Sequence, residues 1–284
     1  MTYLNKLAFV LILLFALPAL ADTVAGGASS STPASSNADK NMGCEQAGAL
    51  RLVLAAVAKT CKAAESAKGS SGPQDNLGCG APSLSSTSSG LAKYSWGGQA
   101  ASSGSTMSVP SGLDCSGFVC AASCRSGIPI KPGNPCAVIR TSEMDQLLSS
   151  GQSCYKPIDQ SKKDGQAYLT AGDLVEYQHS GKSGGHTFAI ERVDPNDCHK
   201  LCIIQEEGTN TGGFIQCTGD GPTGDGQGVS LDDVVKANCS GSSSASGKTK
   251  VMSYSSSAKS GCAPQPAKQI SNGQSCDVGN MPNG

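Results

Sequence analysis

Cys115 is the residue of this chain best suited to nucleophilic chemistry. It lies in the run Leu-Asp-Cys-Ser-Gly-Phe-Val at residues 113–119, where an acidic residue precedes an apolar segment. A helix that begins at Cys115 would place the thiol near unpaired backbone N–H groups and the positive end of the helix dipole, which favour the thiolate over the thiol. The pattern therefore predicts a helix from Cys115 to Ser126 with a primed nucleophile in its first turn.

A cysteine nucleophile needs a partner that accepts and returns a proton near neutral pH, and histidine is suited to this. The chain has three histidines, at positions 179, 186 and 199. His186 opens an apolar run, His-Thr-Phe-Ala-Ile, directly after the flexible Ser183-Gly184-Gly185, so a strand would fix its position and the loop would leave room for a substrate. His179 lies in a polar, Gly-rich segment and His199 adjoins Cys198. We therefore expect His186 to act on Cys115.

The N-terminus indicates export. Residues 1–21 contain a cationic start, an apolar run from Leu7 to Leu17 and the small-x-small segment Ala19-Leu20-Ala21, which together predict a signal peptide. No later stretch approaches the roughly 20 apolar residues that span a membrane, so we expect a secreted or periplasmic protein without membrane attachment once the signal is removed.

Cysteine content and charge narrow the class further. Fourteen cysteines in an exported chain predict disulfide bonds. The 21 basic and 22 acidic residues nearly balance, which gives no basic surface for nucleic acid. We expect a monomer that binds no nucleic acid.

Composition divides the mature chain into four parts. A flexible linker is expected at 22–42, a helical extension followed by a linker at 43–90, a catalytic domain at 91–239, and a low-complexity tail, either stapled by disulfides or disordered, at 240–284. Only the third part has the length and apolar content of an ordinary domain.

The elements expected in that domain are helices followed by strands. After the helix that begins at Cys115, the periodicity predicts a second helix at 141–150 and strands at 174–178, 187–193 and 201–206. Helices followed by a run of strands predict an α+β fold.

Five segments in one order resemble the NlpC family of cell-wall cysteine peptidases and, less closely, the CHAP amidases. They are Tyr-x-Trp-Gly-Gly at 94–98, Asp-Cys-Ser-Gly-Phe-Val at 114–119, Gly-Ile-Pro-Ile at 127–130, Ala-Gly-Asp-Leu-Val at 171–175 and Gly-His-Thr-Phe-Ala-Ile at 185–190. The resemblance covers under half of the chain. It implies a papain-like core with helices packed on an antiparallel sheet, preceded here by the helical N-terminal extension.

The resemblance also implies roles for individual residues. Cys115 would attack an amide carbonyl of a peptidoglycan stem peptide, and His186 would serve as base and then acid. Tyr94, Asp114 and Ser116 match positions that line the substrate pocket in these families. The implied activity is that of a peptidoglycan endopeptidase or amidase. An acyl or peptidyl transferase on the same scaffold and an inactive, disulfide-rich binding protein are the alternatives.

A third polar residue that orients the imidazole is expected on the next strand, within residues 203–207. Because side chains alternate between faces, Gln205 and Glu207 point one way and Glu206 the other. The NlpC family usually carries His, Asn or Gln there, which favours Gln205, whereas CHAP amidases use Glu followed by Asn, which favours Glu206 ahead of Asn210. We place the third residue at Glu206, with Gln205 and Glu207 left open.

Thiol parity makes a separate prediction. One catalytic thiol among fourteen cysteines leaves an odd number, so a monomer holds at most six disulfides and at least two free thiols. Cys120, flanked by Val119 and Ala121, is the expected second thiol. A metal site made of Cys198, His199 and Cys202 has compact spacing but lacks a second ligand pair, so we expect disulfides there and no metal or cofactor.

Overall fold

In the computed structural model of the chain, the structure describes residues 37–57, 93–110, 112–158, 166–178, 185–207, 212–219, 231–241 and 249–270. The expected signal peptide at 1–21 and most of the linker expected at 22–42 lie outside these ranges. Among the residues described, no helix is both long enough and apolar enough to cross a membrane.

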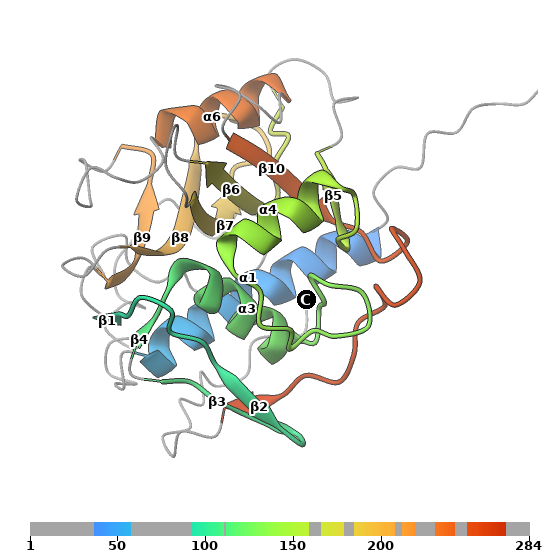
Figure 1. The fold of residues 1–284 in the computed structure, drawn as a ribbon. Helices are drawn as coiled ribbons and strands as arrows, with labels where there is room; N and C mark the ends of the chain where they lie inside the picture. Colours follow the sequence, from blue (N-terminus) through green and yellow to red (C-terminus); the bar gives the residue numbers. More distant parts are fainter. Residues whose placement is uncertain are drawn as a thin grey trace, which may run out of the picture. The chain divides into compact units, whose positions relative to one another are not determined.

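Six antiparallel strands form the central sheet (Figure 1). In the order in which they pair, they are β5 (Tyr155–Pro157), β10 (Thr249–Tyr254), β6 (Leu174–Gln178), β7 (Gly185–Val193), β8 (Leu201–Glu207) and β9 (Gly212–Cys217). Strands β6, β7 and β8 agree with the three strands expected from the sequence. Mixed helices and antiparallel strands confirm the α+β class.

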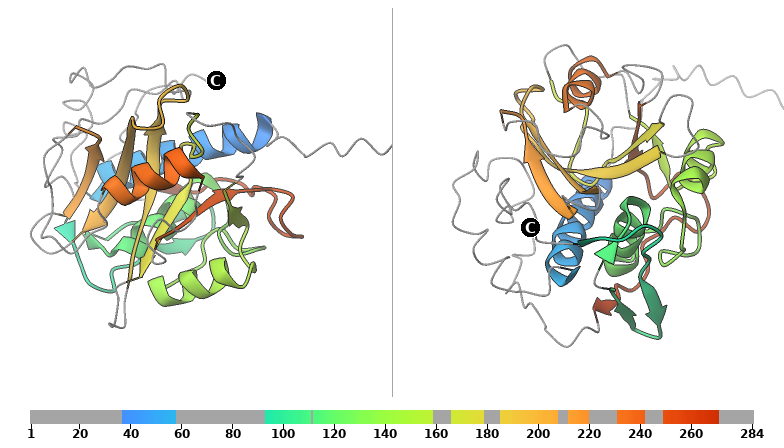
Figure 2. Two further views of the ribbon diagram at one scale, coloured as in Figure 1. Left: turned by 90° about the horizontal axis from the view of Figure 1, so that it is seen from above. Right: turned by 60° about the vertical axis from the view of Figure 1, so that its left-hand side comes forward.

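Helices cover both faces of this sheet (Figure 2). Helices α1 (Asn37–Val57) and α3 (Cys115–Ser126) lie on one face, where Ala189 and Ile204 join the α3 residue Phe118 in one apolar cluster. Helix α6 (Leu231–Ser240) lies on the other face, where Phe188 and Ile203 join a second cluster. Successive residues of β7 and β8 belong to one cluster and then the other, because successive strand residues point to opposite faces of the sheet.

The helix predicted from Cys115 to Ser126 is confirmed as α3, and the one predicted at 141–150 as α4 (Thr141–Ser149). A short parallel pair, β1 (Lys93–Tyr94) and β4 (Gly112–Leu113), leads into α3. The remaining sheet contains β2 (Ala101–Ser103), β3 (Thr106–Ser108) and β11 (Gln269–Ile270).

The segment expected to be an N-terminal extension belongs to the core. Leu50 and Leu54 of α1 are fully buried, and the Arg51 side chain reaches Glu191 of β7 at 2.7 Å. The helix also begins at Asn37, inside the expected linker. Composition missed this start because the first turn of a helix needs no apolar side chain.

The segment expected to be a tail also differs from expectation. Residues 249–254 form β10, which pairs with β5 on one side and β6 on the other. The disulfide between Cys154 and Cys262 fixes the chain just beyond β10, as the stapled alternative anticipated. Six residues, all of them buried or half-buried, suffice for a strand inside the sheet, and a composition argument missed them because their flanks are rich in Ser and Gly.

Disulfide bonds are confirmed as a main feature of the fold. Four lie between described residues: Cys124–Cys136, Cys154–Cys262, Cys198–Cys239 and Cys202–Cys217. Cys44 is disulfide-bonded as well. The free cysteines among the described residues are Cys115 and Cys120, the expected nucleophile and the expected second thiol.

Candidate active site

Asp114 fixes the start of α3. Its Oδ1 accepts hydrogen bonds from the Gly117 N–H at 2.6 Å, the Ser116 hydroxyl at 2.9 Å and the Gln99 amide at 3.1 Å. A carboxylate at the N-cap satisfies a free helix N–H and complements the helix dipole. Asp114 therefore holds Cys115 at the first position of the helix and, through Ser116, orders the residue that follows.

The segment after β1 packs closely against this helix start. The Ser95 N–H donates to the Leu113 carbonyl at 3.0 Å, and the Asp114 N–H donates to the Gly98 carbonyl at 3.1 Å. A Cβ at Gly117 would collide with the Gly98 carbonyl oxygen, so the approach requires glycine. The half-buried Tyr94, two residues before Trp96, pairs with Leu113 and lies near the candidate nucleophile.

The Cys115 thiol is nearly enclosed, with 6% of the residue exposed. Burial raises its pKa above the ordinary value, and the Asp114 carboxylate adds to the rise. The Thr141 hydroxyl, 3.5 Å from Sγ, and the N–H groups of Thr187 and Ser116 oppose the rise without cancelling it. Hydrogen-bonding groups thus surround the thiol, but its burial favours the thiol over the thiolate, which is opposite to the priming expected from the sequence.

Strands β7 and β8 carry the predicted histidine and the candidates for the third catalytic residue, at the end of the sheet where β7 begins and β8 ends. Their pairing runs from Val193↔Leu201 to Ala189↔Ile204, while β7 begins earlier, at Gly185, and β8 ends later, at Glu207. The strand ends beyond this ladder hold a run of polar residues: His186, Thr187, Gln205, Glu206 and Glu207. Cys115 meets this region through the N–H of Thr187, the residue after His186.

His186 is paired with Gln205. The His186 Nε2 and the Gln205 Oε1 are 2.8 Å apart, and both residues are buried. The His186 ring also lies 5.6 Å from that of Phe188, centroid to centroid, on the same face of β7. Of the three candidates for the residue that orients the imidazole, Gln205 therefore has the required contact.

Glu206 lies differently from its expected position. It follows Ile204 by two residues, so its side chain is on the α3 face of β8, opposite to Gln205. It is fully buried, and neither carboxylate oxygen has a hydrogen-bond partner among the residues described. Burial raises its pKa to about 8, and the negative charge of Cys115 contributes to the rise. Glu206 thus interacts with Cys115 electrostatically. The contact with His186 that was expected of Glu206 is made by Gln205.

Two contacts of this site carried no sequence signal. Thr141 is the first residue of α4 and reaches Cys115 across 26 positions of chain. Gln99 braces Asp114 across 15 positions. Neither residue belongs to a recognisable motif at its own position, so only the packing of α4 and of the segment after β1 reveals them.

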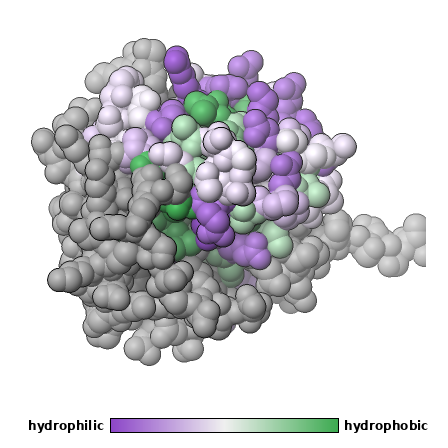
Figure 3. Space-filling model, turned by 90° about the horizontal axis from the view of Figure 1, so that it is seen from below, coloured by the Kyte–Doolittle hydropathy of each residue, from purple (hydrophilic) through white to green (hydrophobic). Residues whose placement is uncertain are grey.

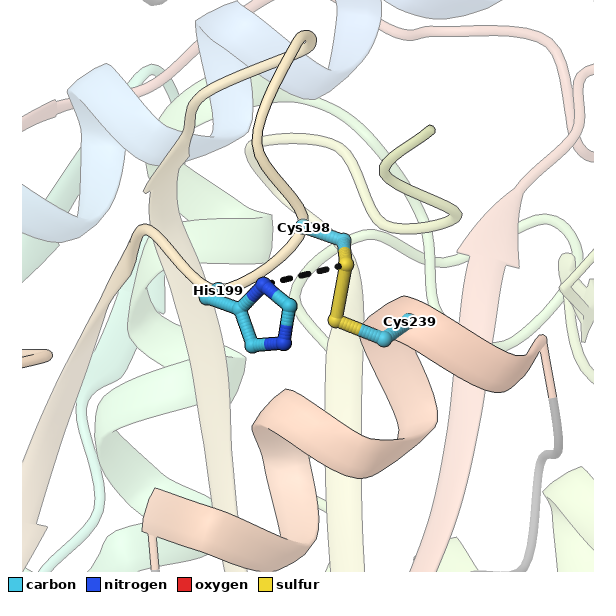
Figure 4. Close-up of side chains that lie close together, drawn as sticks. All are labelled: Cys198, His199 and Cys239. Atoms are coloured by element: carbon cyan, nitrogen blue, oxygen red, sulfur yellow. Dashed lines mark hydrogen bonds between the residues drawn. A yellow bond between two sulfur atoms is a disulfide. The ribbon is translucent and has the colours of Figure 1, made fainter. Parts of the chain in front are cut away.

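The compact Cys-His group at the far end of β8 is a disulfide site (Figure 4). Cys198 is bonded to Cys239 of α6, and His199 Nδ1 lies 3.6 Å from the Cys198 sulfur. Cys202, the third member of the metal alternative, is bonded to Cys217. The sulfurs that a metal would need are therefore committed to cross-links.

Large apolar side chains are rarely exposed. Seen from below the view of Figure 1, the surface shows a few small apolar areas surrounded by polar residues (Figure 3). Among the described residues the exposed large hydrophobics are Trp96, at 86%, and Val138, at 57%.

Comparison with protein-family models, with curated proteins and with solved structures found no match to the chain.

Proposed function

We propose that the protein is a secreted or periplasmic cysteine hydrolase, with a papain-like, NlpC-type core, that cleaves amide bonds in peptidoglycan stem peptides. The observation that carries the proposal is the state of Cys115. It remains a free thiol at the first position of α3 in a protein whose described cysteines are otherwise disulfide-bonded, Cys120 excepted. It also contacts Thr187 of β7, the residue after His186, and His186 is paired with Gln205 of β8.

The proposed reaction divides the work among these residues. His186, oriented by Gln205, accepts the Cys115 proton as the sulfur attacks the amide carbonyl. Because His186 shares the face of Phe188 and Thr187 lies on the α3 face, this transfer requires the imidazole to reach around the start of β7 toward Cys115. The N–H groups at the start of α3 stabilise the oxyanion, and His186 returns the proton to the leaving amine. Water then hydrolyses the thioester, which frees the carboxylate and restores the thiol. Tyr94 would contact the peptide, whereas Ser116 is buried with its hydroxyl bonded to Asp114 and would act by bracing the start of α3.

Digestion of purified muropeptides, with the products identified by mass spectrometry, tests the proposal. Cys115→Ala and His186→Ala should each lower turnover by at least about 10³-fold, because nucleophile and base act as a unit. His199→Ala is the matched control, since the His199 side chain is 76% exposed and precedes the end of β8 that is opposite to Gln205 and Glu206. Full activity of the Cys115→Ala protein would exclude the proposed mechanism.

A second candidate function is a disulfide-rich binding protein without catalysis. The enclosure of Cys115 and its raised pKa favour this candidate, because catalytic thiols usually have lowered pKa values and some exposure. Sedimentation with purified peptidoglycan would detect binding. Retention by the polymer together with unchanged muropeptide masses would favour the binding protein over the hydrolase.

A further inference from the structure

Glu206 is a buried acid that the proposed reaction does not use. Its side chain has no exposed surface, and both carboxylate oxygens lack hydrogen-bond donors within the described ranges. An ionised carboxylate in such surroundings costs several kcal/mol unless a cation or donors compensate it. The environment therefore keeps Glu206 neutral over much of the pH range.

The fold directs this acid toward Cys115. Glu206 lies on the same face as Ile204, and Thr187 on the same face as Ala189, where α3 packs. Cys115 reaches this face through the Thr187 N–H. Electrostatic interaction between Cys115 and Glu206 follows from this arrangement, since little water separates two buried groups.

No described cation is bonded to either acid. The charged and titratable groups on the surrounding elements include Asp114 at the cap of α3, Glu143 and Asp145 on α4, Glu176 on β6, His186, Glu191 and Arg192 on β7, Glu207 on β8, and Arg51 on α1. Within the described ion pairs, Glu191 takes both Arg51 and Arg192, and Asp145 takes Lys250. His186 is bonded to Gln205. A second negative charge beside Cys115 would thus lack compensation from these pairs.

We infer that Glu206 is a positioning residue that sets the ionisation of Cys115, because the two acids share a buried site that holds one negative charge at a time. When Glu206 is protonated, Cys115 can give up its proton. When Glu206 is ionised, Cys115 stays a thiol. Two like charges in one buried site disfavour each other in this way, and they titrate as a pair. This role differs from the orientation of an imidazole, which Gln205 takes.

The pH profile of Cys115 alkylation tests the inference. The native, unreduced protein is treated with iodoacetamide from about pH 5 to about pH 10, and peptide mapping separates Cys115 from Cys120. Glu206→Gln should move the midpoint for Cys115 down by about one pH unit, which is roughly tenfold more thiolate at a fixed pH. Glu207→Gln is the matched control, because Glu207 is the next residue and points to the other face. Equal midpoints in the wild type and both variants would overturn the inference.

A second measurement needs no Glu206 variant. Infrared spectroscopy of the wild type should show a buried protonated carboxyl group at pH 7 that titrates near pH 8, the value to which burial and Cys115 raise the Glu206 pKa. Cys115→Ala should keep this protonated carboxyl group at pH 7, because burial is the main cause of the raised Glu206 pKa and Cys115 is still a thiol where Glu206 titrates. A Glu206 found ionised at pH 7 in the wild type would also overturn the inference. Neither readout depends on turnover, so failure of the proposed hydrolase is distinguishable from failure of this coupling.

Discussion

Two glutamates of the central sheet, Glu191 on β7 and Glu206 on β8, are both fully buried and have opposite surroundings. Glu191 has Arg51 at 2.7 Å and Arg192 at 3.3 Å. Glu206 has no such partner among the residues described, and the group that acts on it electrostatically is another acid, Cys115. The first arrangement ties α1 to the sheet. The Glu206 carboxylate makes no described ion pair or hydrogen bond, and buried acids without such partners are found more often at functional sites.

The sharpest test of this contrast is the pH dependence of stability. The pKa of Glu206 is about 8 in the fold against about 4.5 in the unfolded chain, so raising the pH through this window ionises the unfolded chain first and favours unfolding. The free energy of unfolding of the wild type should therefore fall by about 4 kcal/mol relative to Glu206→Gln over that range. Urea titrations of both proteins at several pH values measure it. Parallel pH curves would show that Glu206 is not held neutral.

Arg51→Met tests the compensated glutamate, because it removes the arginine that pairs with Glu191. Loss of the arginine leaves Glu191 buried with one partner, which should lower the free energy of unfolding by about 3 kcal/mol near pH 7. Denaturation under non-reducing conditions measures the change. Adding Glu191→Gln to Arg51→Met should restore part of the loss. A single variant as stable as the wild type would mean that this pair does not anchor α1.

Gln205→Ala tests whether the His186 pair belongs to the site rather than to the core. Loss of the 2.8 Å contact frees the imidazole, and turnover of muropeptides should fall about 30-fold, equivalent to about 2 kcal/mol. Glu206→Gln, assayed beside it, should retain an oriented His186 and show a shifted pH optimum instead. If Gln205→Ala leaves turnover unchanged, His186 is oriented by another group.

Cys120→Ala should have the smallest effect. Cys120 is buried on α3 and its Sγ donates to the Ile139 carbonyl at 3.6 Å, while burial raises its pKa to about 12. Removing one sulfur from this packed site should cost about 1 kcal/mol and leave Cys115 alkylation unaltered. Peptide mapping after iodoacetamide treatment checks this. Rapid alkylation of Cys120 in the native protein would contradict its burial.

The sequence by itself determined the local features. Residues 113–119 predicted the start of α3 and the nucleophile Cys115, and the apolar neighbours of Cys120 identified it as the second free thiol that parity required. The apolar runs likewise located β6, β7 and β8 to within two residues. All of these depend on neighbouring positions in the chain.

Only the tertiary structure decided what lies beside what. Composition could not show that 249–254 pairs between β5 and β6 or that α1 forms part of the core, since both depend on partners far along the chain. The order of residues 205–207 likewise could not say which side chain meets His186, because a shift of one residue exchanges the faces of a strand. The register of β8 gave His186 to Gln205 and left Glu206 facing Cys115, where burial governs its charge.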